Sequence, residues 1–118
     1  MTKEEALYKY FNNFGLTAYP SNAVPTETAF PWLTYSTPIG YDGDVSAEIN
    51  LWYHTESEAI PNKKANEIAE CLGVGGVTVP YDGGIIWIKR DNPFIQSLTD
   101  QNDASIKRRQ INLIYEYL

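Results

Sequence analysis

The stretch Val45–Thr55 (VSAEINLWYHT) alternates between two kinds of side chain. The residues of the first kind are mostly aliphatic: Val45, Ala47, Ile49, Leu51 and Tyr53. Those of the second kind are mainly polar: Ser46, Glu48, Asn50, Trp52 and His54. A period of two is typical of a β-strand that buries one face. The stretch therefore predicts a half-buried strand in which Trp52 and His54 point away from the aliphatic side.

The residues before this strand predict a hairpin partner. Trp32–Ile39 (WLTYSTPI) reads as a strand, and the intervening GYDGD contains the turn-forming step Asp42-Gly43. Leu16–Pro31 holds three prolines among mixed polar residues and reads as a long connecting loop. We expect such a loop to be functional or mobile.

A first helix is predicted over residues 3–14. Thr2 and Glu5 have the spacing of a capping box, and the apolar residues that follow fall on one helical face. Gly15 supplies the left-handed residue that commonly ends a helix.

A second helix is predicted after the central strand. Ser57 is the favoured N-cap, because it places Pro61 on the fourth helical residue, where no intrahelical amide bond is lost. Thr55 is then left to cap a preceding turn. The helix ends at Gly73. Glu58 lies where a negative charge suits the helix dipole, so no chemistry is needed to explain it.

The last third of the chain predicts three strands. Gly76–Pro80 and Ile85–Arg90 flank a turn at Asp82-Gly83-Gly84 and form a second hairpin. Asp91–Ser105 reads as a polar loop, and Ile106–Leu118 alternates as a long final strand.

These elements predict one α+β domain over residues 1–118, in the order α-β-β-α-β-β-β. We expect a mostly antiparallel sheet of four to five strands with two helices packed on one face. The other face must then be solvated or meet a partner. Trp52 lies on that side and favours a partner.

Bulk composition limits the classes of function. A chain of 118 residues fits one domain, and a 14% aromatic share favours an interface above the usual prior. The net charge of −6 disfavours DNA reading, because binding to phosphates needs clustered cations. The single cysteine excludes an internal disulfide and a multi-thiolate zinc site. The N-terminal sequence predicts neither a signal peptide nor a membrane span.

Catalytic, cofactor and metal sites are not predicted. His54 and Cys71 could be imagined as a base and a nucleophile, but no third group marks an oriented trio. Gly73–Gly76 (GVGG) lacks the spacing and the Lys-Ser/Thr pair of nucleotide-binding loops. The aspartates of Asp91–Asp103 lack the spacing of a calcium-binding EF-hand.

Lys89, Arg90, Arg108 and Arg109 concentrate positive charge late in an acidic chain. They form either a solvated, salt-bridged sheet face or an interface that meets acidic residues of a neighbouring copy. The sequence leaves both interpretations open.

The element order resembles that of the tail terminator, or tail-completion, proteins of long-tailed bacteriophages. The stretches that carry this resemblance are AFPWLTYS (29–36), EINLWYHTESEAIPNKKANEIAECL (48–72), IIWIKRDNPF (85–94) and IKRRQINLIYEYL (106–118). The resemblance covers about Thr2 to Leu118 and extends to the minor capsid and neck proteins of such phages.

This resemblance implies a non-enzymatic part of the virion, assembled in the bacterial cytoplasm. Such proteins form rings, usually hexameric, that end tail-tube growth and join the tube to the head connector, while DNA passes through unbound. We expect interface residues at Trp52, His54, Asp82, Lys89, Arg90, Phe94, Arg108 and Arg109, and contacts from the Leu16–Pro31 loop. The alternatives are another neck component, such as a head-closure or minor capsid protein, or a small ligand-binding or enzymatic domain.

Overall fold

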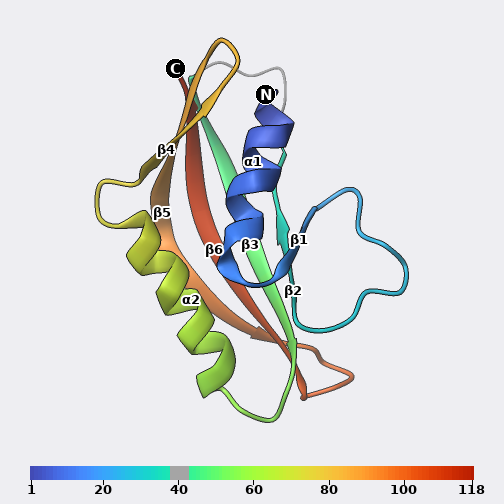
Figure 1. Cartoon of the computed structure of the whole chain (residues 1–118). Coiled ribbons are helices and arrows are strands. Elements are labelled where there is room, and N and C mark those ends of the chain that lie inside the picture. The colour runs from blue at the N-terminus through green and yellow to red at the C-terminus, as the bar shows by residue number, and fades with distance from the viewer. Residues whose placement is uncertain (38–42) are drawn as a thin grey trace.

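The computed structural model describes residues 1–37 and 43–118. Its elements are α1 (Lys3–Phe11), a 3-10 turn (Asn12–Phe14), β1 (Thr17–Pro20), β2 (Trp32–Tyr35), β3 (Gly43–His54), α2 (Ala59–Leu72), β4 (Val77–Tyr81), β5 (Gly84–Thr99) and β6 (Ile106–Tyr117). The strands form one curled sheet in the order β1-β2-β3-β6-β5-β4. Both helices lie on the same side of this sheet (Figure 1).

The predicted strand number and element order are wrong, and the sheet is mixed, although the α+β class fits. The described residues form six strands rather than four or five, and β1 pairs in parallel with β2, so the sheet is mixed. The extra strand β1 lies inside the predicted loop Leu16–Pro31, where Ala18 is buried in the core. Four residues are too few for alternation to be recognised in the sequence.

The predicted polar loop Asp91–Ser105 is also largely wrong, because β5 continues through it to Thr99. The register between β5 and β6 shifts between Arg90 and Ile95 and then resumes, with Ile95 opposite Ile111. Pro93 falls in this irregularity, where a missing amide hydrogen costs no ladder bond. The second half of β5 was therefore not recognised in the sequence, because the residues at the break in its pairing resemble a loop.

The start of α2 differs by one residue from its prediction. Glu58, not Ser57, occupies the N-cap, and it makes no side-chain capping bond. The Thr55 hydroxyl instead accepts the Ser57 amide at 3.1 Å and caps the turn before the helix. Pro61 is the third helical residue, which still lies within the first turn that tolerates proline.

Other local predictions are confirmed. The Thr2–Glu5 capping box is present, and Gly15 ends the first helical segment in the left-handed conformation. In β3, the side chains of Ala47, Ile49, Leu51 and Tyr53 are buried against the helices. Of the first predicted hairpin, the pairing of β2 with β3 is observed, but Pro38, Ile39 and the turn residue Asp42 lie outside the described residues.

Both margins of the sheet are protected against pairing with another strand. The Asn12 side chain acts like a strand segment beside β1, because its Oδ1 accepts the Ala18 amide at 3.1 Å and its Nδ2 donates to the Tyr8 carbonyl at 2.8 Å. Pro20 and Pro80 remove amide donors from β1 and β4. Such devices are how natural sheets prevent edge-to-edge association.

Candidate interaction surface

The helix-free side of the sheet carries a cluster of aromatic rings and one cation. We call this cluster the aromatic patch, and its members are Phe30, Trp32, Trp52, His54 and Arg108. The pairing register places Trp32 beside Trp52 and Trp52 beside Arg108, so three neighbouring strands contribute one row across the sheet. The patch therefore forms from segments far apart in the sequence.

The rings of the patch contact one another directly. Trp32 and Trp52 stack with centroids 5.2 Å apart and an interplanar angle of 9°. The Arg108 guanidinium lies 5.2 Å from the Trp52 ring, within the range of a cation–π contact. The Phe30 ring lies 5.7 Å from that of His54. Stacked tryptophans with an adjacent arginine are the residue types that protein interfaces enrich.

Arg108 has no acidic partner among the residues that the structure describes. Its recorded contact is with the Trp52 ring, and the side chain is half-buried. In a chain of net charge −6, an arginine left without a carboxylate is available to an acidic group of another molecule.

His54 lies at the rim of the patch, with Nε2 3.7 Å from a carboxylate oxygen of Asp103. Hydrogen bonds from the Ser105 side chain and backbone are the main reason that the pKa of Asp103 is lowered, with a smaller contribution from His54. The predicted strand orientation of Trp52 and His54 is therefore observed, and both side chains remain accessible.

The other predicted interface cations have partners within the chain. The Lys89 Nζ lies 2.8 Å from Glu116 on the helix-free side, and it stands 4.5 Å from the Trp87 ring. The pKa of Lys89 is raised, chiefly by the hydrogen bond to Glu116. For Lys89, the structure thus favours the salt-bridged interpretation over an unpaired contact cation.

Arg90 and Phe94 lie together beside the end of α2. The Arg90 guanidinium donates to the carbonyls of Gly73 and Ala69 at 3.0 Å each, and its plane is 4.6 Å from the Phe94 ring. Arg90 thus adds donors at the carboxyl end of α2, where the Ala69 carbonyl also accepts the Gly73 amide. Its position is explained by the fold.

Arg109 and Asp82 are also engaged elsewhere. Arg109 is only 1% exposed and binds residues of α2, so it belongs to the core and not to a free surface. Asp82 lies at the β4–β5 turn, where its carboxylate pairs with the N-terminal ammonium of Met1. Of the eight predicted residues, the structure brings together Trp52, His54 and Arg108.

Two members of this surface were not predicted from the sequence. Phe30 and Trp32 join the patch because β2 pairs with β3 in a register that places Trp32 opposite Trp52. Trp32–Ile39 was predicted as a strand, but neither the sides of its residues nor its register with β3 was predicted. A hairpin turn of known length would have identified the Trp32–Trp52 pair.

The structure does not assemble the imagined His54–Cys71 pair. Cys71 is exposed on α2, on the helix side of the sheet, whereas His54 lies on the helix-free side. Residues 1–37 and 43–118 contain no group of three or more metal-binding side chains. In the same residues, no helix is long and apolar enough to cross a bilayer.

No family model matches the chain, and neither a curated protein nor a solved structure is significantly similar to it. The resemblance to phage tail terminators therefore rests on the sequence pattern alone.

Proposed function

We propose that this protein is a structural subunit of a phage or prophage tail, a tail terminator that assembles into a ring, ends tail-tube growth and joins the tube to the head. The aromatic patch is the observation that carries this proposal, because it offers a docking surface with no catalytic group at its centre. A structural subunit works by geometry, and a closed ring leaves two unlike faces for two unlike partners.

The shielded margins of the sheet support the same proposal. Because Asn12, Pro20 and Pro80 disfavour the addition of a long strand, we expect contacts with other subunits to depend mainly on side chains.

The test is to inactivate the gene in its own phage or prophage and to examine the particles by electron microscopy. We expect tail tubes of uncontrolled length that do not join heads. Complementation with Trp52→Ala or Arg108→Glu should fail, because each removes a central member of the patch. Tyr8→Ala is the matched control, since Tyr8 is 56% exposed on the helix side of the sheet.

Tails of normal length without heads would instead indicate a head-closure protein. Normal, infectious particles after inactivation of the gene would refute a role in tail assembly of any kind.

A further inference from the structure

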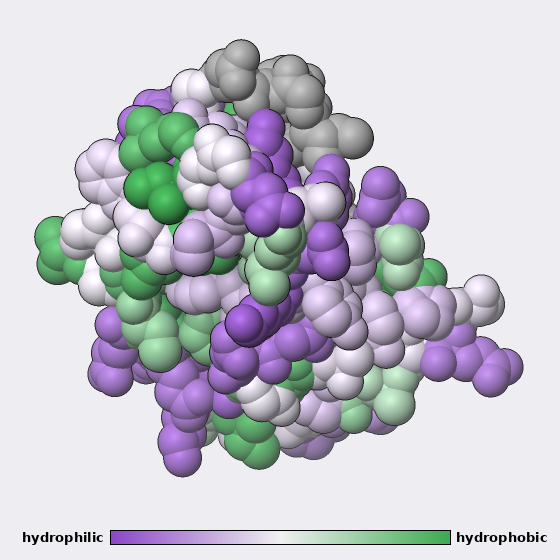
Figure 2. Space-filling view, turned by 45° about the horizontal axis from the view of Figure 1, so that its top comes forward, coloured by the Kyte–Doolittle hydropathy of each residue, from purple (hydrophilic) through white to green (hydrophobic). Residues whose placement is uncertain are grey.

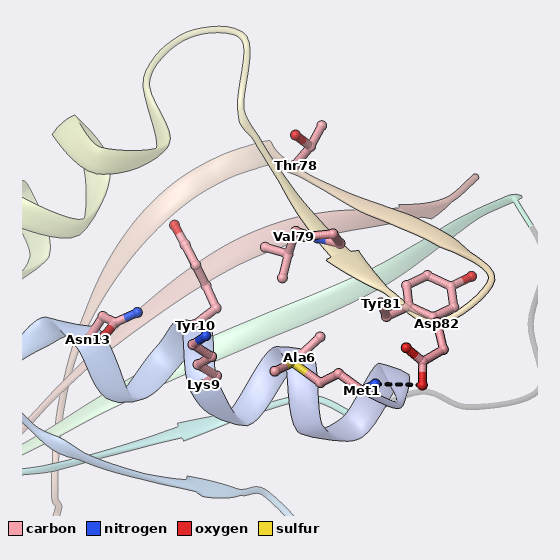
Figure 3. Close-up of a pocket in the computed structure, with 10 residues that line it drawn as sticks. Met1, Ala6, Lys9, Tyr10, Asn13, Thr78, Val79, Tyr81 and Asp82 are labelled. Atoms are coloured by element: carbon pink, nitrogen blue, oxygen red, sulfur yellow. Dashed lines mark ion pairs between the residues drawn. The ribbon is translucent and has the colours of Figure 1, made fainter.

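A groove of about 470 Å³ runs between α1 and the outer margin of β4. Figure 3 shows Ala6 and Tyr10 of α1 facing Val79 and Tyr81 of β4 across it, with the Met1–Asp82 ion pair at one end. Its lining is mainly apolar and open to solvent. An open apolar groove beside a terminal strand is a shape that suits an extended peptide segment.

One cation in this groove has no ion pair within the described residues. Lys9 lines the groove and is exposed. The one carboxylate of the lining, Asp82, is paired with the Met1 ammonium. An occupant with an acidic group would therefore meet a cation that the chain leaves without a salt bridge.

The backbone of β4 adds a short recognition element. The Ile85 amide and carbonyl both bond Leu118, so Ile85 exchanges no bonds with Pro80, the residue opposite it. By the alternation of an antiparallel ladder, the Thr78 amide and carbonyl and the Pro80 carbonyl then point away from β5, at the outer margin beside the groove. These backbone groups could bind an extended segment at two residues. Two residues are too few for a long strand to pair with the sheet.

A segment with matching chemistry projects at the other end of the sheet. The β1–β2 loop, Ser21–Pro31, stands out on the opposite side of the molecule from β4 (Figures 1 and 2). Its tip holds Val24, Pro25 and Glu27, and Glu27 is exposed without an ion pair in the described chain. Phe30 at its base contacts the aromatic patch, which anchors the loop's return to the sheet.

We propose that the β1–β2 loop of one copy seats in the α1–β4 groove of the next copy. Val24 and Pro25 would cover the apolar lining, Glu27 would pair with Lys9, and the loop backbone would bond Thr78. In its own chain the loop projects away from this groove (Figure 1), so the proposed contact is between copies. This inference deepens the proposed function, because it takes a second copy as the occupant.

The contact is head-to-tail, since it joins two different surfaces of the same chain. Such contacts generate a closed ring or an open filament, depending on the rotation between neighbours. Copies of net charge −6 repel at long range, so association needs local complementarity of the kind that Lys9 and Glu27 provide.

Charge reversal tests the contact in the purified full chain. Sedimentation equilibrium should show that Lys9→Glu and Glu27→Lys each weaken self-association by roughly tenfold, while the double variant recovers most of the loss. Glu56→Lys is the matched control, because Glu56 is exposed without an ion pair in the described residues and lies away from both surfaces. Failure of the double variant to recover, or a chain that stays monomeric up to about 1 mM, would overturn the contact.

Cross-linking tests its direction. In a Cys71→Ser background, Val24→Cys and Val79→Cys chains should form a disulfide with each other when mixed, and neither should do so alone. Cross-links within a single variant would indicate a two-fold contact and overturn the head-to-tail arrangement.

These outcomes separate the inference from the proposed function. In one outcome, Trp52→Ala causes tail defects while the charge reversals leave self-association unchanged. That result would refute the loop–groove contact and leave the proposed terminator function standing. If the double variant recovers self-association but inactivation of the gene leaves tails normal, the contact stands and the proposed terminator function is refuted.

Discussion

Arg109 is the largest fully buried side chain of the described residues, and two of its hydrogen bonds tie β6 to the start of α2. Its Nε donates to the Asn62 amide oxygen at 2.8 Å and a terminal nitrogen donates to the Glu58 carboxylate at 2.6 Å. Lys107 adds a second cation 3.5 Å from the same carboxylate. Glu58 thus neutralises a buried charge. The sequence had predicted only a favourable interaction of Glu58 with the helix dipole.

The Glu58 interaction should make stability depend on pH. The pKa of Glu58 is lowered from its ordinary value of 4.5, first by the hydrogen bond from Arg109. A carboxyl with a lowered folded pKa stabilises the fold above its unfolded pKa, and this contribution is lost as the pH falls through the folded value. Glu58→Gln should therefore lower the urea midpoint at pH 7, and the difference from wild type should shrink below pH 4.5.

Glu56→Gln is the control for this experiment, because Glu56 lies two residues away without an ion pair in the described chain. Its urea midpoint should follow wild type at every pH. An equal effect of the two substitutions, or a Glu58→Gln deficit that persists unchanged at pH 2 to 3, would show that Arg109 does not depend on this carboxylate.

At the scale of elements, the short strand β1 depends on a side chain from the 3-10 turn. Asn12 bonds both the amide and the carbonyl of Ala18, so it fills the place that a further strand would take. The amide of one side chain thus joins the end of α1 to the margin of the sheet.

Removing this side chain should both destabilise the protein and expose the margin. Asn12→Ala leaves the Ala18 backbone groups without partners, which should cost roughly 1–3 kcal/mol of unfolding free energy. We expect higher light scattering on mild heating, because an open strand pairs with other chains. Asn13→Ala is the matched control, since Asn13 is exposed. Equal stability and scattering for the two variants would contradict this role.

The elements that the sequence predicted well are those with their own local signal. The capping box of Thr2 and Glu5 and the alternation of β3 and β6 depend only on nearby residues, and both are observed. β1 and the second half of β5 depend on partners distant in the sequence: β1 pairs in parallel with β2, and β5 resumes pairing only where Ile95 meets Ile111. Such strands are specified by tertiary context, which a single sequence does not show.

At the scale of the whole molecule, the sheet has one packed side and one contact side. Ile111, Leu113 and Tyr115 of β6 are fully buried beneath the helices, whereas the alternate residues of β6 are half-buried on the helix-free side. The alternation of β3 predicted that Trp52 and His54 would share a side, but nothing in the sequence placed Arg108 beside them. It could not predict how closely Trp32 and Phe30 approach them, because that depends on the register between strands.

Substitutions at two neighbouring residues of β6 test whether the helix side of the sheet is packed more tightly than the helix-free side. Leu113→Ala should lower the unfolding free energy by about 2–5 kcal/mol, because it opens a cavity beneath the helices. Ile114→Ala, one position along the same strand, should cost about 1 kcal/mol or less. Urea unfolding of both variants checks the order, and an Ile114 effect equal to that of Leu113 would show that the second side is packed as well.

The position of β6 has a consequence for how the protein is made. It follows every other described strand in the sequence, yet it lies in the middle of the sheet, between β3 and β5. Until residues 106–117 have been synthesised, β3 and β5 have no strand to join them, and the apolar residues of both stay uncovered. A chain cut short before residue 106 should therefore yield no folded product.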